Sequence, residues 1–388
     1  MIAPQLVQIR RAVHRHPELG FQEHCTATLV AESLRSLGIR VETGIGKTGV
    51  VGFIGSGGPV IALRAEMDAL PIQELNCTDY ASQVPGVMHA CGHDVHVACL
   101  VGAAMLLQEA RPKGQVRLLF QPSEEGMDDE GKSGAVRMIE DGAIDGVEAI
   151  FGLHVDGKYP VGTLACSPGC IMAAMDNFEV VIVGHSAHGA QAYLGVDAIL
   201  LAAQVVNAIN TIVSRRISAL DSGAISIGTI HGGTKENILA EKVELRGTIR
   251  SFDPEVHRTL KREIDRSCHV ARAMGGEYRL LIKDGYPALF NDSSLVALVR
   301  DVVRDMIGPE ATRDCEPEMG ADDFSFYLQR VPGCYFMLGT GTQGEPVRPL
   351  HHPRFDVDES TLPIGAVILA QTAIRYLTTR DGPLSYEL

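Results

Sequence analysis

The sequence lacks the features that would place it in a membrane or on a nucleic acid. No apolar run approaches the ~20 residues that a membrane-spanning helix needs. Acidic residues outnumber basic ones by 48 to 34, and the net charge of −14 disfavours nucleic acids and anionic membrane surfaces as partners. The first residues show no basic stretch followed by an apolar core, so we expect no signal peptide and a cytoplasmic location.

Low-complexity segments and internal repeats are also missing, and the totals are those of a globular protein. Hydrophobic residues make up 45% and charged residues 21% of the 388 positions. A chain of this length exceeds one ordinary domain, so we expect about two domains. Nine cysteines are an odd number, which indicates reduced thiols rather than a disulfide framework in a chain without a visible secretion signal.

Strand and helix patterns alternate through residues 1–173 and again through 287–388, which predicts an α/β fold with helices layered on a sheet. Short apolar strands are expected at 60–63, 116–120 and 149–153, and polar residues follow each of them. Ligands gather beyond the carboxyl ends of the strands in such sheets. The residues delivered there are Glu66 and Asp68, Glu124 and Glu125, and His154.

A different pattern, β-α-β-β-α-β, occupies residues 174–286. This is the element order of the ferredoxin-like split unit. We therefore predict an inserted domain at 174–286 and a main domain made of 1–173 and 287–388.

A glycine-rich turn at 55–58 separates two strand patterns near the N-terminus. It lacks the lysine and the following helix of a phosphate-binding loop. We therefore predict a hairpin turn between paired strands.

The densest set of reactive side chains lies in residues 88–96, which read Met-His-Ala-Cys-Gly-His-Asp-Val-His. Five of these nine residues are His, Cys or Asp, which bind transition metals or move protons. One glycine separates Cys91 from His93, and its backbone freedom lets the thiolate and the imidazole reach one ion from a tight turn. The alternative for this stretch alone is a buried cysteine beside surface histidines, since short Cys/His matches arise by chance.

Other segments offer residues that can complete a site. Glu124 and Glu125 are adjacent, and neighbouring side chains in an extended or loop backbone point in different directions, so one can bind a metal while the other addresses a water. His351 and His352 lie in a proline-containing loop that can close a metal site, and the pattern does not choose between them. His188, after the first strand of the inserted domain, can reach a substrate or can be a polar turn residue.

Taken in order, these motifs resemble those of the binuclear metallo-amidohydrolase family, which includes hippurate hydrolases, bacterial N-acyl-amino acid amidohydrolases (aminoacylases) and plant indole-acetyl-amino-acid hydrolases. The resemblance extends over nearly the whole chain and is specific at family level. The matching segments are 16–20, 63–71, 88–96, 121–126, 152–154, 194–197, 232–237, 244–250, 319–324 and 350–353.

The resemblance implies a zinc-peptidase-like α/β catalytic domain with an inserted ferredoxin-like domain that acts as a lid and a dimerisation surface. It implies two divalent metal ions per subunit, of Zn, Mn, Co or Ni, with Cys91 bridging them. The other implied ligands are His93, Glu125, His154 and His351.

The same resemblance implies the remaining roles. Glu124 would be the general base, and Asp68 would orient a ligand. His188, from a partner subunit of a homodimer or higher homo-oligomer, would stabilise the oxyanion. The residues implied in substrate binding are Asn237, Arg250 and Gly320.

The implied reaction is hydrolysis of the amide bond of an N-acyl amino acid, which releases a carboxylate and a free amino acid. A metallocarboxypeptidase or dipeptidase acting on short peptides is the second possibility. A thiol hydrolase with Cys91 as nucleophile, and a non-catalytic metal or peptide binder, are two further alternatives. The sequence departs from the family pattern at Glu66, at 192–193, at 321–322 and at 127–130, and these departures leave the substrate open.

Overall fold

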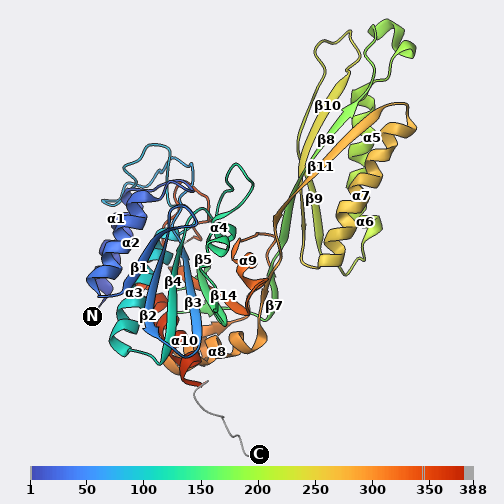
Figure 1. Cartoon of the computed structure of the whole chain (residues 1–388). Helices are drawn as coiled ribbons and strands as arrows, with labels where there is room; N and C mark the ends of the chain where they lie inside the picture. Colours follow the sequence, from blue (N-terminus) through green and yellow to red (C-terminus); the bar gives the residue numbers. More distant parts are fainter. Residues whose placement is uncertain (1, 343, 345, 380–388) are drawn as a thin grey trace, which may run out of the picture. The chain divides into compact units, whose positions relative to one another are not determined.

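The structure is a computed structural model that describes residues 2–342, 344 and 346–379. The chain divides into two compact units (Figure 1). The first unit comprises Met1–Gly169, Phe290–Glu316 and Asp323–Leu388, and the second comprises Cys170–Leu289 and Pro317–Asp322. The short segment Pro317–Asp322 groups with the second unit, which the sequence pattern does not indicate. None of the described helices combines the length and apolarity that a bilayer span requires.

The first unit is built on an eight-stranded mixed sheet in the order β1-β2-β4-β3-β5-β14-β6-β13. The central strands β4, β3, β5 and β14 are parallel and mostly buried, apart from the last part of β5, as expected for a parallel sheet covered by helices on both faces. The strands are β1 (Arg40–Ile45), β2 (Gly49–Ser56), β3 (Val60–Glu66), β4 (Gly114–Gln121), β5 (Ala149–Pro160), β6 (Leu164–Ala165), β13 (Thr312–Arg313) and β14 (Gly333–Gly341).

Helix α3 (His93–Ala110) is the central helix of this unit and is buried along most of its length. It packs against α10 (Thr361–Thr379) at two glycines. A Cβ at Gly102 would lie 2.7 Å from the Cβ of Ala366, and one at Gly365 would lie 2.7 Å from the Sγ of Cys99, so the small residues permit this close approach. The other helices are α1 (Ala3–Arg15), α2 (His24–Ser36), α4 (Gly134–Glu140), α8 (Ser293–Met306), α9 (Phe324–Leu328) and the 3-10 turn η2 (Pro309–Ala311).

The prediction of a hairpin at the glycine-rich turn 55–58 is wrong. Strands β2 and β3 lie on opposite sides of β4, with β2 antiparallel and β3 parallel to it. The hairpin lies earlier, between β1 and β2, where Arg40 pairs with Phe53. A glycine-rich turn indicates that the chain reverses, but the long-range pairing with β4 decides which strands are neighbours.

The second unit is a four-stranded antiparallel sheet in the order β11-β8-β10-β9, with helices on one face (Figure 1). The element order is the predicted β-α-β-β-α-β, with one short additional helix. Asp253 caps helix α7, and Pro254 occupies its first position. The elements are β8 (Ala174–Val183), α5 (Ala198–Asn210), α6 (Ile212–Arg216), β9 (Gly223–Gly232), β10 (Lys242–Ser251), α7 (Pro254–Ala273) and β11 (Glu277–Tyr286), with the 3-10 turn η1 (Gly189–Leu194). The short strands β7 (Gly169–Met172) and β12 (Leu289–Asn291) each include residues of both units.

A buried ionic network joins the N-terminal helix of the first unit to the start of α3. Arg10 of α1 is fully buried, and its Nε donates to the Oδ2 of Asp94 at 2.7 Å. Its Nη2 donates to the Oδ1 of Asp356 at 3.0 Å, in the segment that follows the His351 loop. The Nδ1 of His14 lies 2.8 Å from the same Asp94 oxygen. Helix α1 thus fixes Asp94, the residue next to His93, through Arg10 and His14, and Arg10 is itself held by Asp356.

The charge state of His14 makes this network sensitive to pH. Burial alone would lower the pKa of His14, but Asp94 and Glu74 outweigh it and raise the pKa from 6.5 to about 9. A raised folded-state pKa adds stability that is complete below the unfolded value and is lost as the pH rises through the folded value.

We expect His14→Gln to flatten the pH dependence of stability between pH 6.5 and 9. The free energy of unfolding of the wild-type protein should fall more steeply across this interval, because His14 loses its charge beside Asp94. Urea unfolding at several pH values measures both curves. His16→Gln, which changes an exposed histidine two residues away, is the matched control and should follow the wild type. Parallel curves for wild type and His14→Gln would refute this assignment.

Candidate metal centre and active site

Three parallel strands and one helix start bring the predicted ligands to one place in the first unit. Asp68 follows β3, Glu124 and Glu125 follow β4, and His93 begins α3. His154 lies inside β5 rather than after it, because this strand continues to Pro160. The prediction that polar residues gather beyond the carboxyl ends of the strands is therefore confirmed for Asp68, Glu124 and Glu125. His154 reaches the same place from within its strand.

Gly92 permits the tight turn between Cys91 and His93. Its φ of 88° is in the left-handed region, where residues with a Cβ are strained. A Cβ at this position would also lie 2.3 Å from the Cγ2 of Val155. Glycine is therefore required both by the backbone angle and by the packing against β5.

The predicted ligand atoms form three overlapping groups, in each of which all atoms lie within 4.8 Å of one another. The Sγ of Cys91 belongs to two groups and lies 3.4 Å from the Nε2 of His154. The Nε2 of His351 lies 3.0 Å from the Oε1 of Glu125. The groups are Cys91, His93 and His154; Cys91, Glu125 and His351; and His93, Glu124 and Glu125.

The structure distinguishes the two neighbouring histidines of the C-terminal loop. His351 faces Glu125, and its backbone has a φ of 59°. The Nδ1 of His352 instead accepts a hydrogen bond from the backbone N–H of Arg354 at 3.1 Å, within its own turn. Of the two, His351 is the one placed among the predicted ligands.

The hydrogen bonds of two histidines leave the other ring nitrogen suited to a metal. The Nδ1 of His93 lies 2.8 Å from the carbonyl oxygen of Asp68, and the Nδ1 of His154 lies 2.8 Å from that of Val155. A proton on each Nδ1 leaves the Nε2 lone pair free. The Nε2 of His93 is buried and has no hydrogen-bond partner among the described residues. A buried polar atom of this kind fits a metal ligand.

Asp68 holds two of these residues at once. Its Oδ1 lies 3.1 Å from the Nδ1 of His93, and its Oδ2 accepts the backbone N–H of Glu125 at 2.9 Å. Burial would raise its pKa, but the hydrogen bond and the charge of His93 lower it below the usual value. Asp68 therefore stays ionised and orients both side chains.

The site carries an excess of buried negative charge. Burial, followed by the charges of Glu125 and Glu124, raises the pKa of the Cys91 thiol well above its usual value. Burial alone would lower the pKa of His93, but the hydrogen bond and charge of Asp68, followed by the charges of Glu66 and Glu125, raise it to about 10. A thiol with a raised pKa is a poor nucleophile, which disfavours the thiol hydrolase alternative. A divalent cation would compensate this charge, and the donor set of one thiolate, imidazoles and a carboxylate fits Zn, Co, Ni or Mn.

A second buried network, which includes Glu66 from the strand end and His96 from the 88–96 stretch, supports the backbone next to His154. The Nδ1 of His96 lies 2.8 Å from the Oε2 of Glu66, and its Nε2 accepts the backbone N–H of Val155 at 3.0 Å. Glu66 also contacts Arg64, which is fully buried. The only sequence signal for His96 is its position three residues after His93, on the same face of α3.

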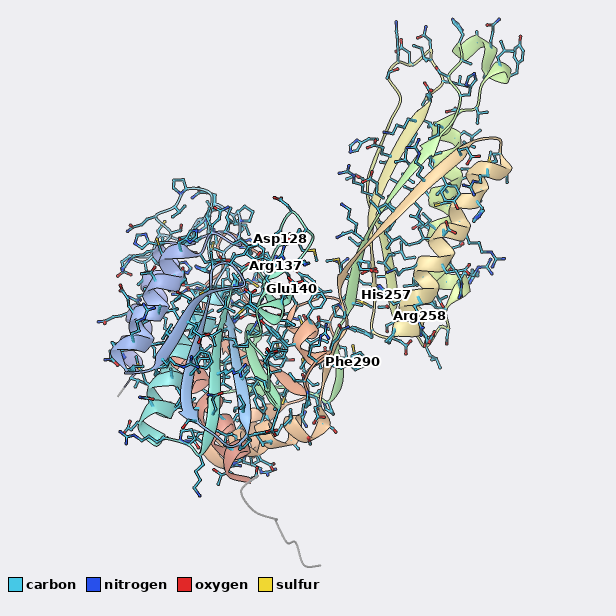
Figure 2. All side chains as sticks on the ribbon, viewed as in Figure 1. Asp128, Arg137, Glu140, His257, Arg258 and Phe290 are labelled. Atoms are coloured by element: carbon cyan, nitrogen blue, oxygen red, sulfur yellow. The ribbon has the colours of Figure 1, made fainter. Side chains whose placement is uncertain are left out.

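The loop that follows Glu125 is folded by an ion-paired turn. Asp128 accepts from the Nζ of Lys47 at 2.6 Å and from the Nε of Arg137 at 2.7 Å, and its Oδ1 accepts the backbone N–H of Glu130 at 3.0 Å. Figure 2 labels Asp128 and Arg137 together with Glu140, which Arg137 also contacts. The departure from the family pattern at 127–130 is therefore an ordered structural feature beside the candidate site.

Four of the predicted site residues, all expected to contact the substrate, lie in the second unit, and they occupy two separate places. They are His188, Asn237, Arg250 and Gly320. The backbone N–H of Gly189 donates to the carbonyl of Asn237 at 2.8 Å, so His188 and Asn237 lie in adjoining loops. Arg250 lies near the far end of β10, opposite Met175, and the carbonyl of Gly320 accepts the N–H of Ala173 at 2.9 Å.

These two places are separated by the length of a strand. The His188 and Asn237 loops adjoin the Lys242 end of β10, and the eight residue-to-residue steps from Lys242 to Arg250 span about 26 Å. The unit of one chain therefore does not bring His188 and Arg250 together.

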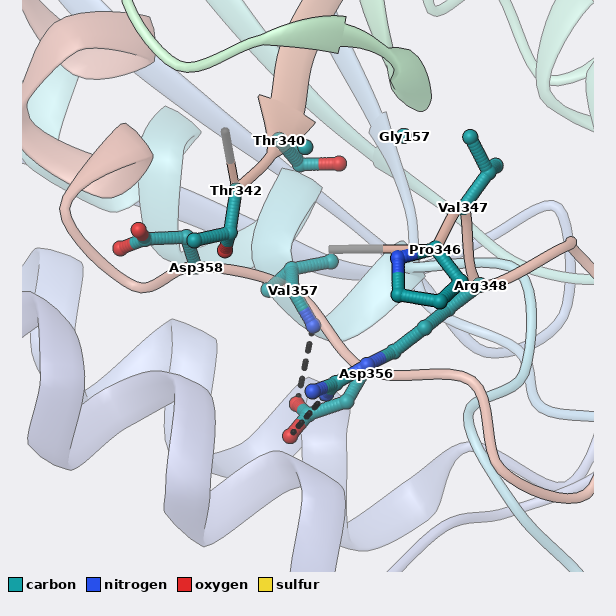
Figure 3. Close-up of a pocket in the computed structure, with 10 residues that line it drawn as sticks. Gly157, Thr340, Thr342, Pro346, Val347, Arg348, Asp356, Val357 and Asp358 are labelled. Carbon is teal, nitrogen blue, oxygen red and sulfur yellow. Dashed lines mark hydrogen bonds and ion pairs between the residues drawn. The ribbon is translucent and has the colours of Figure 1, made fainter. Parts of the chain in front are cut away.

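A separate cavity of about 230 Å³ lies by the end of β14 (Figure 3). Its lining includes Thr340, Arg348 and Asp356, and Arg348 contacts Asp356 at 3.3 Å. None of the predicted ligands is among the described residues that line it. This cavity is distinct from the ligand groups described above.

Comparisons with known proteins identify the family of this chain. The family profile of Peptidase family M20/M25/M40 matches residues 62–375. Thermostable carboxypeptidase 2 of Saccharolobus solfataricus is 41% identical over 96% of this chain and 95% of its own length. N-acetyl-L-cysteine deacetylase of Bacillus subtilis is 38% identical over 97% of this chain and 89% of its own length.

A solved structure extends the similarity to the whole fold. The YXEP protein of Bacillus subtilis, described as a dinuclear metal binding peptidase from the M20 family, superposes with a TM-score of 0.85. It is 33% identical and covers 97% of this chain and 99% of its own chain. The family resemblance and the mixed α/β fold predicted from the sequence are thus confirmed. On the profile match and on full-length relatives at about 40% identity, this chain belongs to peptidase family M20/M25/M40.

Proposed function

We propose that this protein is a metal-dependent amidohydrolase that cleaves the amide bond of N-acyl amino acids. The observation that carries the proposal is Cys91, whose sulfur belongs to two ligand groups while Glu124 lies beside them. The Oε2 of Glu124 is 4.0 Å from the Nε2 of His93, so a carboxylate stands at the edge of the ligand cluster. The residues that would hold two divalent ions are Cys91, His93, Glu125, His154 and His351.

Bound at these residues, the ions would polarise the amide carbonyl and make water more acidic. Glu124 takes the proton of the attacking water and later delivers it to the leaving nitrogen. Asp68 keeps His93 and the Glu125 backbone in place during this transfer. Proton transfer by a positioned group typically contributes 10²–10⁴-fold to the rate.

His188 is suited to donate a hydrogen bond to the oxyanion. Its Nδ1 accepts the backbone N–H of Ala190 at 3.0 Å, which places the ring proton of the neutral form on Nε2. The side chain is exposed and Nε2 is therefore available to a substrate. A donor aimed at an oxyanion typically contributes ~3 kcal/mol to transition-state stabilisation.

The second unit would act as a lid and as the dimerisation domain, with His188 acting on the partner's substrate. Strand β9 lies at the edge of its sheet and is largely exposed, including Ile230. The separation of His188 from Arg250 in one chain supports the assignment of His188 to the other subunit. Arg250 and Gly320 would contact the substrate carboxylate or carbonyl from one subunit, and Asn237, whose loop adjoins His188, would contact it from the other.

The names of the relatives support a substrate with an amide next to a free carboxylate. They include the N-acetyl-L-cysteine deacetylase and IAA-amino acid hydrolase ILR1-like 2 of Arabidopsis thaliana, which is 37% identical over 96% of this chain and 85% of its own length. The thermostable carboxypeptidase supports the second candidate, a carboxypeptidase or dipeptidase on short peptides. One site chemistry serves both reactions, because both cleave an amide.

We expect Glu124→Gln to retain both metal equivalents and to lose nearly all turnover, because the amide cannot accept the proton of the attacking water. Metal analysis of the purified variant and steady-state kinetics measure the two effects separately. Glu130→Gln, which alters an exposed carboxylate of the same loop, is the matched control and should remain active. Near-normal turnover by Glu124→Gln would remove Glu124 from the mechanism.

A mixed dimer tests whether His188 acts across the subunits. A heterodimer of one Glu124→Gln subunit and one His188→Ala subunit contains one intact site if His188 acts in trans, and none if it acts in cis. We expect purified, doubly tagged heterodimers to show about half the wild-type turnover, while each homodimer is impaired. Heterodimers as inactive as the parent homodimers would place His188 in its own subunit's site. Unchanged metal content in His188→Ala is required, since loss of metal would make His188 a ligand.

Release of free amine from a substrate panel tests the reaction class. The panel contains hippurate, N-acetyl amino acids, indole-acetyl amino acids and dipeptides, each assayed with added Mn, Co or Zn and again with chelator. We expect metal-dependent release from the N-acyl amino acids that chelator abolishes. Release from dipeptides alone would favour the peptidase candidate. Chelator-resistant release that alkylation stops would favour the thiol hydrolase instead.

A further inference from the structure

The backbone just before Glu124 is unusually constrained. Ser123 has a φ of 42°, in the left-handed region that residues with a side chain rarely adopt. Three glycines surround this turn. A Cβ at Gly20 would lie 2.4 Å from the Oγ of Ser123, one at Gly134 would lie 1.6 Å from the carbonyl oxygen of Pro122, and one at Gly49 would lie 3.0 Å from the Cδ of Pro122. Backbone from three parts of the first unit therefore encloses the turn that presents the catalytic carboxylate.

One buried carboxylate holds this turn. The Oε1 of Glu23 accepts the backbone N–H of Ser123 at 2.8 Å and that of Phe21 at 2.9 Å. Phe21 also has a positive φ, of 60°. The Oε2 of Glu23 accepts the hydroxyl of Thr48. A single oxygen thus fixes two strained backbone positions that lie 102 residues apart in the sequence.

Glu23 does not cap helix α2, although its position at the helix start would ordinarily favour that role. It occupies the N-cap of α2 but makes no side-chain capping bond. The carboxylate of Glu18 instead accepts the N–H groups of Cys25 and Thr26, each at 2.9 Å, in the first turn of that helix. The two glutamates of this N-terminal segment therefore have separate tasks, one on the helix and one on the Ser123 turn.

We infer that Glu23 is a positioning residue for Glu124, which it aims by holding the left-handed turn at Ser123. This inference rests on the proposed role of Glu124 as the general base. Strained backbone persists at functional sites only where the surroundings determine it, and here the acceptor oxygen and the close glycines do so. Glu23 works as an acceptor rather than as a charge, because Oε1 accepts in both protonation states. Burial, the largest effect, raises its pKa to about 7, which is compatible with either state.

The test compares Glu23→Ala with Glu23→Gln. Alanine removes the acceptor and frees the Ser123 turn, so we expect kcat to fall about 10- to 100-fold with KM changed less than about twofold, since a displaced catalytic group costs rate more than binding. Glutamine retains the acceptor oxygen towards Phe21 and Ser123, and its amide can donate to the Thr48 hydroxyl. Glu23→Gln should therefore keep kcat within about threefold of the wild type.

Glu18→Ala is the matched control, because it removes a carboxylate that accepts backbone hydrogen bonds in the same segment but does not contact Ser123. It should lower the unfolding temperature and leave kcat unchanged at temperatures where the protein is folded. Metal titration with a chromophoric chelator provides the readout that does not depend on activity. We expect Glu23→Ala to bind two metal equivalents with unchanged affinity, because Asp68 still holds the Glu125 backbone.

The outcomes separate this inference from the proposed function. Wild-type kcat in Glu23→Ala, or equal impairment of the alanine and glutamine variants, overturns the positioning role while an inactive Glu124→Gln leaves the general base in place. An active Glu124→Gln overturns the proposed mechanism itself. If Glu23→Ala does not fold, Glu23→Asp tests the same contact, because it keeps the charge and shortens the reach by one methylene. An aspartate variant with kcat within twofold of the wild type would then overturn the inference.

Discussion

The arrangement of the candidate site depends on the buried carboxylate of Asp68, because it meets residues from two other segments. One oxygen contacts His93 at the start of α3, and the other holds the backbone of Glu125 after β4. Strand β3, which ends two residues before Asp68, lies between β4 and β5 in the sheet. The central parallel strands thus set the distance between the loops of the candidate site. The Asp68 side chain then fixes the positions of two proposed ligands, His93 and Glu125, relative to each other.

The clustering of the proposed ligand residues could be predicted from the sequence because its signals are local. Cys91, Gly92 and His93 are consecutive, Glu124 and Glu125 are adjacent, and each set follows a strand or begins a helix. The choice of His351 over His352 could not be made in this way. It depends on which imidazole faces Glu125, and that direction is set by a left-handed backbone in the loop.

The residues that support the ligands left no comparable signal. Arg10 contacts Asp94, 84 positions later, and Glu23 contacts Ser123, 100 positions later. Isolated charged residues on a helix are ordinarily solvated, so nothing in the local pattern marks these as buried. The hairpin prediction at 55–58 failed for a related reason, since pairing with the distant β4 separates the two strands.

The N-terminal segment is therefore part of the site although it holds none of the proposed ligands. The family profile begins at residue 62, whereas Arg10, His14 and Glu23 all precede it. Arg10 and His14 fix the residue next to His93, and Glu23 fixes the residue next to Glu124. A buried charge without its partner is strongly unfavourable, so Asp94 requires this segment for its own stability. The region matched by the family profile contains the proposed ligands and the proposed general base. The helices before it contribute charged groups and hydrogen-bond acceptors that hold this region in one conformation.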